Sequence, residues 1–323
     1  MFLIFTIQCF FMTIPVLDLS HFTKGTSAEK TTFVQDLGIT FETIGFVSIK
    51  NHEISQSLIN NLYLVVQEFF ALSPAEKEAY EIPGLAGQRG YTSFGKEHAK
   101  GSTSADLKEF FQFGQSIMGK DNTTYPENVQ VSDNELFNSS FLDIYRSFEN
   151  AGTSLLQAIA MYLNLDEFYF DEHVFEGNSI LRAIHYPPIT SEPRSSLRAE
   201  QHEDINLITL LVGASSEGLE VMSKNNEWIP VKAGEGEIVV NVGDMLQRLT
   251  NDKLKSTTHR VVNPPREKWN TSRFSIPFFL HPKSEMSLAC LSSCITSSNE
   301  KKYVDYTAGQ YLDERLKEIG LKK

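Results

Sequence analysis

Residues 198–211 read RAEQHEDINLITLL, and they decide how the rest of the chain is interpreted. His202 and Asp204 are separated by one residue and precede a largely apolar run from Ile205 to Leu211. A run of this length is long enough for a buried strand but too short for most helices. Side chains at positions i and i+2 of a strand point to the same side. We therefore expect the imidazole of His202 and the carboxylate of Asp204 to converge on one point.

A second histidine lies in the segment STTHRVV at residues 256–262. His259 heads another β-branched run there, so a β-structure could bring it to His202 and Asp204. Two histidines and one carboxylate can hold Fe(II) through three positions on one face and leave the others open. Asp244 competes with Asp204 as the carboxylate, but its Val-Gly-Asp-Met setting favours a turn between core strands, in which we also expect Asn241 and Gly243. We predict a metal site formed by His202, Asp204 and His259.

A later strand carries an Arg-x-Ser pattern, in the segment RFSIPFF at residues 273–279. Arg273 and Ser275 alternate along it and could jointly grip a carboxylate. Arginine suits this task because its planar guanidinium donates two parallel hydrogen bonds. Phe279 and His281 continue the same alternation, so they could face a substrate.

Several separated motifs in the right order resemble the isopenicillin N synthase-like branch of the Fe(II)/2-oxoglutarate-dependent oxygenases. The resemblance covers nearly the whole chain from about Ile14. The motifs are LRAIHYPP at 181–188, GLEV at 218–221, WIPV at 228–231, VVNVGDMLQ at 239–247, LKSTTHRVVNP at 254–264 and RFS at 273–275.

The resemblance implies a set of cofactors and roles. Fe(II) would be held by the two histidines and Asp204, and the distal carboxylate of 2-oxoglutarate by Arg273 and Ser275, with Tyr186 also in contact. Dioxygen would be the other cosubstrate, ascorbate is a candidate reductant, and no catalytic side chain is expected beyond the metal centre. Conversion of 2-oxoglutarate to succinate and CO2 would be coupled to hydroxylation or desaturation of a small organic substrate. His185 and Ile184 depart from the family's usual tyrosine and asparagine, which leaves the cosubstrate's hydrogen bonds open.

Other functions stay open on the same motifs. Relatives such as isopenicillin N synthase and aminocyclopropanecarboxylate oxidase use Fe(II) and dioxygen without 2-oxoglutarate but keep an Arg-x-Ser pair. Other relatives convert 2-oxoglutarate itself to ethylene. A jelly-roll module that binds a carboxylate without catalysis is a fourth alternative, which the intact ligand set disfavours.

Composition narrows the range of partners. The 323 residues are 41% hydrophobic and 22% charged, as in an ordinary globular protein. The formal net charge of −12 argues against a nucleic-acid surface, which needs a basic stripe. The odd number of cysteines, Cys9, Cys290 and Cys294, fits free thiols in a reducing compartment, so we expect a cytoplasmic protein. We also expect a small-molecule substrate and no membrane partner.

The pattern of apolar runs predicts a mainly β protein with flanking helices. From residue 179 onward, short apolar runs divided by Gly, Pro and Asn indicate a double-stranded β-helix, or jelly roll. We place this catalytic core at 178–281 and an N-terminal α/β extension at 12–120. Helices are expected at 27–43 with Ser27 as cap, at 55–70, from 74 onward with Ser73 and Glu76 as a capping box, and at 134–163 and 305–319.

Two further expectations concern the ends of the chain and the substrate pocket. Met1 to Phe11 is apolar, uncharged and too short to span a bilayer, so we interpret it as a wrongly assigned start or a leader, with Met12 as the true start. The pocket is expected to be lined by the Gly90–Tyr91 loop, Phe94, Phe113, Phe279 and the C-terminal segment.

Overall fold

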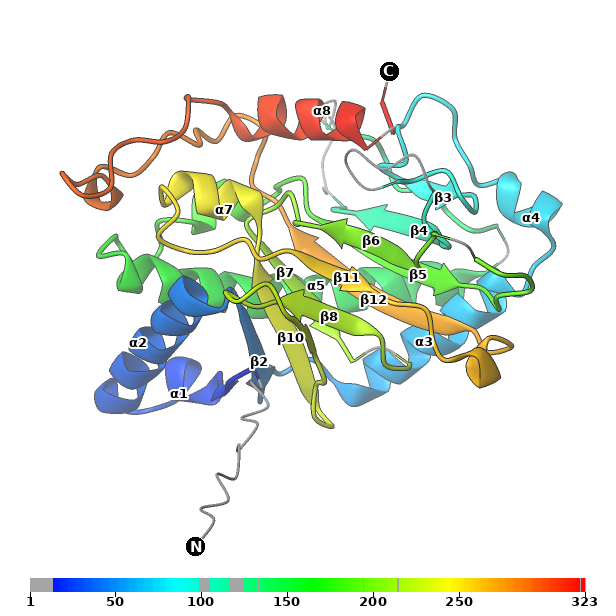
Figure 1. The fold of residues 1–323 in the computed structure, drawn as a ribbon, viewed down its shortest axis with the longest axis horizontal. Helices are drawn as coiled ribbons and strands as arrows, with labels where there is room; N and C mark the ends of the chain where they lie inside the picture. Colours follow the sequence, from blue (N-terminus) through cyan, green and yellow to red (C-terminus); the bar gives the residue numbers. More distant parts are fainter. Residues whose placement is uncertain are drawn as a thin grey trace, which may run out of the picture.

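The computed structural model describes residues 14–98, 105–116, 125–132, 134–193, 195–213, 215–319 and 321–322. The interpretation of Met1–Phe11 and Met12 lies outside the described residues. In the part described, two β-sheets lie one in front of the other, and helices cover the outer face of the larger sheet (Figure 1). None of the helices in these ranges is long and apolar enough to cross a lipid bilayer.

The two sheets form the predicted jelly-roll core. The larger sheet has the strand order β1-β2-β10-β7-β12-β5-β4-β3, and the smaller has β6-β11-β8-β9. Among the described strands β1 and β2 pair in parallel, whereas the other pairs are antiparallel. The strands are β1 (Val16–Asp18), β2 (Phe46–Lys50), β3 (Gly90–Thr92), β4 (Glu109–Gly114), β5 (Ile180–Tyr186), β6 (Ala199–His202), β7 (Ile208–Val212), β8 (Leu219–Met222), β9 (Trp228–Pro230), β10 (Glu237–Val242), β11 (His259–Val261) and β12 (Arg273–Leu280).

Several helices begin at a residue whose side chain caps them. The predicted cap at Ser73 is confirmed, because its side chain accepts from the backbone of Glu76. The predicted cap at Ser27 is one residue late: Thr26 caps this helix, because Glu29 lies three positions after it and completes the capping box. The helices are α1 (Ser20–Thr23), α2 (Ser27–Thr43), α3 (Gln56–Phe70), α4 (Pro74–Glu78), α5 (Glu135–Tyr162), α6 (Asp171–Val174), α7 (Asp244–Leu249) and α8 (Ala308–Glu318), with 3₁₀ turns at Arg266–Lys268 and Ser292–Cys294.

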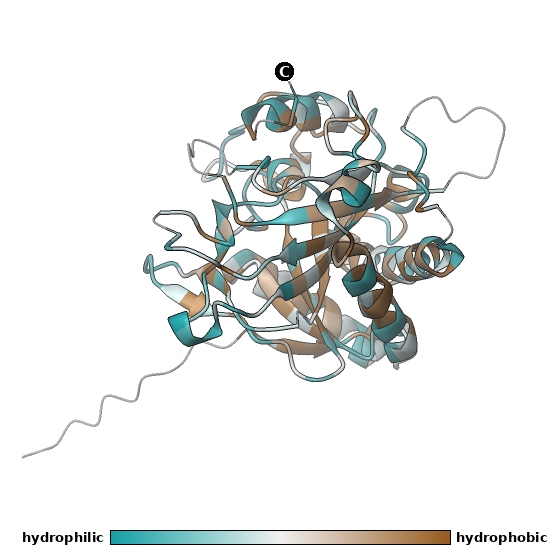
Figure 2. Cartoon of the chain, turned by 90° about the vertical axis from the view of Figure 1, so that its right-hand side faces the viewer, coloured by the Kyte–Doolittle hydropathy of each residue, from teal (hydrophilic) through white to brown (hydrophobic). Residues whose placement is uncertain are grey.

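Aromatic packing joins the helices to the outer face of the larger sheet. The ring centroids of Phe69 on α3 and Phe111 on β4 lie 5.1 Å apart, and Phe111 is the same distance from Phe137 on α5. Phe113 packs against Phe141 in the same layer, so the expectation that Phe113 lines the substrate pocket is wrong. The reason is strand alternation, which turns Phe111 and Phe113 toward the helices. In Figure 2 the hydrophobic colour accordingly gathers in the strands and the adjoining helix faces.

Candidate metal centre

The inner faces of the two sheets enclose the residues that the sequence singled out. Ile184 and Tyr186 on β5 pack with Phe110 of the larger sheet and with Ala199 and Val261 of the smaller sheet. Because strand residues alternate, Arg182 lies on the same inner face of β5. The space between the sheets is therefore where polar side chains from both can meet.

Strand pairing brings the two histidines together. His202 ends β6 and His259 begins β11, and these two residues are direct partners across the antiparallel pair. Their ring centroids lie 4.4 Å apart. The Oδ1 atom of Asp204 is 3.9 Å from Nε2 of His202 and 3.7 Å from Nε2 of His259. One ligand atom from each residue can be chosen so that all three lie within 4.8 Å of one another, which suits a single metal ion.

Backbone carbonyls orient both imidazoles. Nδ1 of His202 is 2.6 Å from the carbonyl oxygen of Glu200, and Nδ1 of His259 is 3.1 Å from that of Thr257. A carbonyl oxygen can only accept, so each Nδ1 carries the proton and donates it. In a neutral ring, Nε2 then presents its lone pair toward Asp204, which is the arrangement that orients histidine ligands in metal sites.

Asp204 reaches the site by a different route from the one predicted. Strand β6 ends at His202, so Asp204 lies in the segment that crosses from the smaller sheet to β7 of the larger one. Its carboxylate is fixed there by two neutral donors: Oδ2 accepts from Oγ1 of Thr209 at 2.6 Å and from Nδ2 of Asn241 at 2.8 Å. The two residues therefore converge because the chain changes sheets between them, not because they alternate along one strand.

The electrostatic environment keeps the ligand set ready for a cation. Burial raises the pKa of Asp204, but the histidines and the hydrogen bonds from Asn241 and Thr209 outweigh burial and hold that pKa below its usual value. Burial, followed by repulsion from His259, lowers the pKa of His202, although 34% of its side chain stays exposed. At neutral pH the site therefore offers an anionic carboxylate and a neutral His202 imidazole.

The predicted carboxylate-binding residues lie together on the larger sheet. Arg273 on β12 is the direct partner of Tyr186 on β5, and its Cζ atom lies 4.9 Å from the Tyr186 ring centroid. Arg273, Tyr186 and Ser275 are all buried. Nε of Arg273 donates to the carbonyl oxygen of Ser216 at 3.2 Å, whereas its buried Nη1 has no acceptor among the described residues. An unpaired buried guanidinium nitrogen is the feature expected of a site that receives an anion.

Two other titratable residues from the motifs play no part in the triad. His185 faces away from Tyr186: its Nδ1 is 2.7 Å from Oε1 of Glu109, and its ring stacks on Phe274 with centroids 4.7 Å apart. The His185 side chain, which stands where the family usually has tyrosine, therefore lies on the face of β5 opposite Tyr186. Asp244 begins α7 and accepts a hydrogen bond from Tyr311 at 2.9 Å.

Asn241 shows what the sequence interpretation missed. We expected it in a turn, but it lies within β10 and supports Asp204. The available signal was a polar residue inside the otherwise apolar run Val239–Val242, because a buried polar side chain needs a partner. Thr209 gave no comparable signal, since threonine is common in strands.

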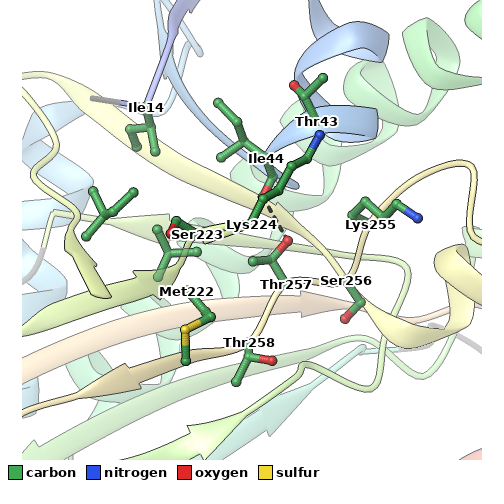
Figure 3. A pocket seen from close by; sticks show the side chains of 12 residues that line it. Ile14, Thr43, Ile44, Met222, Ser223, Lys224, Lys255, Ser256, Thr257 and Thr258 are labelled. Carbon is green, nitrogen blue, oxygen red and sulfur yellow. Dashed lines mark hydrogen bonds between the residues drawn. The ribbon is translucent and has the colours of Figure 1, made fainter. Parts of the chain in front are cut away.

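A separate hollow of about 270 Å³ opens near the smaller sheet (Figure 3). Thr257 and Thr258, which precede His259, line it, and Oγ1 of Thr257 donates to the carbonyl oxygen of Ile44 at 2.7 Å. Its lining is mainly apolar, with Lys224 and Lys255 as its charged residues. Because it contains none of the three ligands, we place the chemistry at the triad.

Comparisons with known proteins agree with this fold and ligand set. A family model described as the 2OG-Fe(II) oxygenase superfamily matches residues 177–282, and one described as non-haem dioxygenase in morphine synthesis N-terminal matches 14–133. The chain is 33% identical over 320 residues to proline hydroxylase buaE of Petromyces alliaceus, covering 94% of this chain and 99% of that protein.

Solved structures give the same result. A 2OG-Fe(II) oxygenase family protein from Caulobacter crescentus matches with a TM-score of 0.84 and 39% identity, covering 95% of this chain and 99% of that one. A Neurospora crassa protein in complex with alpha-KG, which is 2-oxoglutarate, and thymine matches with a TM-score of 0.83 and 30% identity, covering 94% and 96% of the two chains.

Fold, ligand set and relatives together define a non-haem iron oxygenase. The chain belongs to the 2OG-Fe(II) oxygenase superfamily. It is a 2-oxoglutarate-dependent dioxygenase whose cofactor is Fe(II) and whose cosubstrate is 2-oxoglutarate.

Proposed function

We propose that His202, Asp204 and His259 hold the Fe(II) and that this enzyme hydroxylates a small organic substrate beside it. The observation that carries the proposal is the convergence of the three ligand atoms within 4.8 Å. When bound, Fe(II) and 2-oxoglutarate together supply the oxidising chemistry, in which dioxygen is consumed, 2-oxoglutarate becomes succinate and CO2, and a C–H bond of the substrate is oxidised. The protein supplies ligation, orientation and a shielded site.

Each ligand has a defined task in this proposal. The carbonyl oxygens of Glu200 and Thr257 hold the protons on Nδ1, so that Nε2 of each histidine is the ligand atom. Asp204 contributes the negative charge through Oδ1, because Thr209 and Asn241 occupy Oδ2. With three ligands from the protein, the metal would keep coordination positions for the cosubstrates.

We further propose that Arg273, Ser275 and Tyr186 bind the distal carboxylate of 2-oxoglutarate. The buried Nη1 of Arg273 has no acceptor among the described residues, and a carboxylate would supply one. Tyr186 lies across the strand pair from Arg273 and supports the guanidinium with its ring. The three side chains would thus orient the cosubstrate and keep water from the distal end.

The substrate is proposed to lie further along the inner face of β12, next to Phe279. The Cζ atom of Arg182 lies 4.1 Å from the Phe110 ring centroid and 5.2 Å from that of Phe279. Arg182 donates to Gln112 and Glu97, so the half-buried Phe279 ring is the flat surface available to a small ring compound. One relative is named a proline hydroxylase, and another was solved in complex with thymine. Proline and thymine are both small nitrogen-containing ring compounds, so we propose a substrate of this class.

Two narrower assignments belong to the same proposal. Placement in the isopenicillin N synthase-like branch rests on the motif order quoted above. A cytoplasmic location rests on the free thiols expected from an odd cysteine count.

The test is turnover under isotopically labelled dioxygen with a panel of small nitrogen-containing ring compounds, analysed by mass spectrometry. Hydroxylation predicts one labelled oxygen atom in succinate and one in the product, and neither in the His202→Ala variant. An oxidised product without succinate would instead support an oxidase that does not use 2-oxoglutarate. Succinate with an unlabelled, dehydrogenated product would support desaturation.

A further inference from the structure

A second arginine is buried beside the proposed cosubstrate site. Arg198 lies four residues before His202 and is 1% exposed. Its Nη2 donates to the carbonyl oxygen of Thr271 at 3.0 Å, whereas its buried Nε has no acceptor in the part of the chain that the structure describes. Its Cζ atom lies 5.9 Å from the Tyr186 ring centroid, so this ring has both Arg198 and Arg273 as neighbours.

The two guanidinium groups form a buried pair of like charge, which we call the arginine pair. In the described part of the chain, neither Arg198 nor Arg273 forms an ion pair with a carboxylate. Burial and the charge of Arg273 lower the pKa of Arg198 to about 10, which leaves it cationic at neutral pH. Two buried cations without an anion are unfavourable, because each has lost its hydration and gained only a neutral carbonyl partner in place of an opposite charge.

Arg89 shows that a single buried arginine need not indicate a ligand. It is also 1% exposed and donates to the side-chain oxygen of Gln115 and to the carbonyl oxygen of Gln88, at 2.7 Å each. Nε of Arg89, like Nε of Arg198, is buried without an acceptor among the described residues, so an unpaired nitrogen alone does not indicate a ligand. The arginine pair differs because two buried cations share one aromatic neighbour, the Tyr186 ring. A carboxylate, with its two acceptor oxygens and negative charge, is the chemical group that offsets this combination.

We propose that Arg198 is a second cation of the cosubstrate site and that, with Arg273, it restricts the site to 2-oxo acids that carry a distal carboxylate. The inference rests on the proposed function, in which Arg273 receives that carboxylate. Arg198 acts on affinity and selectivity through its charge and its unpaired Nε, and the metal ligands do not depend on it. Attraction between opposite charges is strong at this depth because the surroundings have a low dielectric constant.

The experiment compares two ligands on the Fe(II)-loaded protein without oxygen. 2-Oxoglutarate and 2-oxobutyrate share the keto acid end, but 2-oxobutyrate lacks the distal carboxylate. Dissociation constants are taken from the visible band that a chelated keto acid produces. We expect Arg198→Gln to weaken 2-oxoglutarate binding by about 10- to 100-fold, the range for losing a hydrogen-bonded charge, and to leave 2-oxobutyrate binding within about 2-fold.

Two further variants separate charge from packing. Arg198→Lys keeps the positive charge and should recover most of the preference for 2-oxoglutarate. Arg89→Gln removes a buried arginine that donates to Gln115 and Gln88, so it should leave the preference unchanged. If Arg198→Gln does not fold, Arg198→Met serves in its place, since the longer apolar side chain fills more of the same space.

The outcomes are distinct. An unchanged affinity of the Arg198 variants for 2-oxoglutarate would overturn the inference, as would an equal loss for both keto acids. A selective loss that lysine restores supports it. If the wild-type protein gave no band with either compound, the proposed function itself would fail, which is a separate result.

Discussion

Two groups of buried charges lie between the sheets, and they differ in one respect. Glu97, Asp106, Lys108 and Arg182, which we call the balanced cluster, contain two acids and two bases. Nζ of Lys108 lies 2.6 Å from Glu97 and 2.8 Å from Asp106, and Arg182 pairs with Glu97 at 3.1 Å. The arginine pair contains two bases and no acid among the described residues.

The difference indicates which charges serve the fold and which serve a ligand. Buried charges that are paired and hydrogen-bonded can be accommodated by the protein alone. Buried cations without an anionic partner remain unfavourable until an anion binds. Anion binding therefore explains why the arginine pair is present. The balanced cluster should therefore matter for stability with or without ligand, whereas the arginine pair should matter chiefly for the cosubstrate.

The largest predicted effect comes from breaking the balanced cluster. Lys108→Met would leave Glu97 and Asp106 with Arg182 as the remaining cation of the cluster, and removal of one partner of a buried ion pair destabilises a protein by about 3–5 kcal/mol. Arg198→Met should change the ligand-free stability by less than about 1 kcal/mol, or increase it, because it removes an unpaired buried cation. Urea unfolding of both variants measures the two values. Equal destabilisation would remove the distinction between the groups.

The pH dependence of the unfolding free energy tests the balanced cluster through Glu97. Burial raises the pKa of Glu97, but Arg182 and Lys108 outweigh burial and lower that pKa from 4.5 to about 2. A depressed carboxyl pKa contributes stability above about pH 4.5 that is lost as the pH falls toward 2. The advantage of wild type over Glu97→Gln in unfolding free energy should therefore shrink by about 2 kcal/mol between pH 6 and pH 3. A gap that stays constant with pH would show that Glu97 is not held ionised by its neighbours.

A smaller effect is expected at Asp204, a buried carboxylate whose two hydrogen-bond donors, Thr209 and Asn241, are neutral. Asn241→Ala removes one of its two donors and should weaken Fe(II) binding by about 10-fold, the lower end of the range for residues that orient metal ligands. Competition with a chelator under anaerobic conditions measures this. Asn138→Ala, which removes hydrogen bonds to the backbone of Val131, is the matched control and should leave iron affinity unchanged.

Much of the site could be predicted from residues that carry their own signal. The two histidines, Asp204 and the Arg-x-Ser strand have chemically distinctive side chains, and the structure brings each set together. The short apolar runs divided by turn residues likewise predicted the jelly-roll core, and helix start and stop signals predicted most helices. The change of sheets between His202 and Asp204 was not predictable, because a short apolar run does not show where one strand ends and the next begins.

Contacts between residues far apart in the sequence could not be predicted either. Glu97 meets Arg182 across 85 residues. Glu97 lies outside the strands, in a segment whose carbonyl accepts from the backbone of Asp106, so no local pattern reveals this pairing. Phe113 was assigned to the wrong face because a one-residue change of register exchanges the two faces of a strand.

The most direct test of the metal site compares two carboxylates. Iron content and the visible band on addition of 2-oxoglutarate are measured anaerobically in wild type, Asp204→Ala and Asp244→Asn. The account predicts one Fe(II) per chain and a band in wild type and Asp244→Asn, and neither in Asp204→Ala. Retention of iron and band in Asp204→Ala, or their loss in Asp244→Asn, would contradict the assignment of Asp204 as the carboxylate ligand.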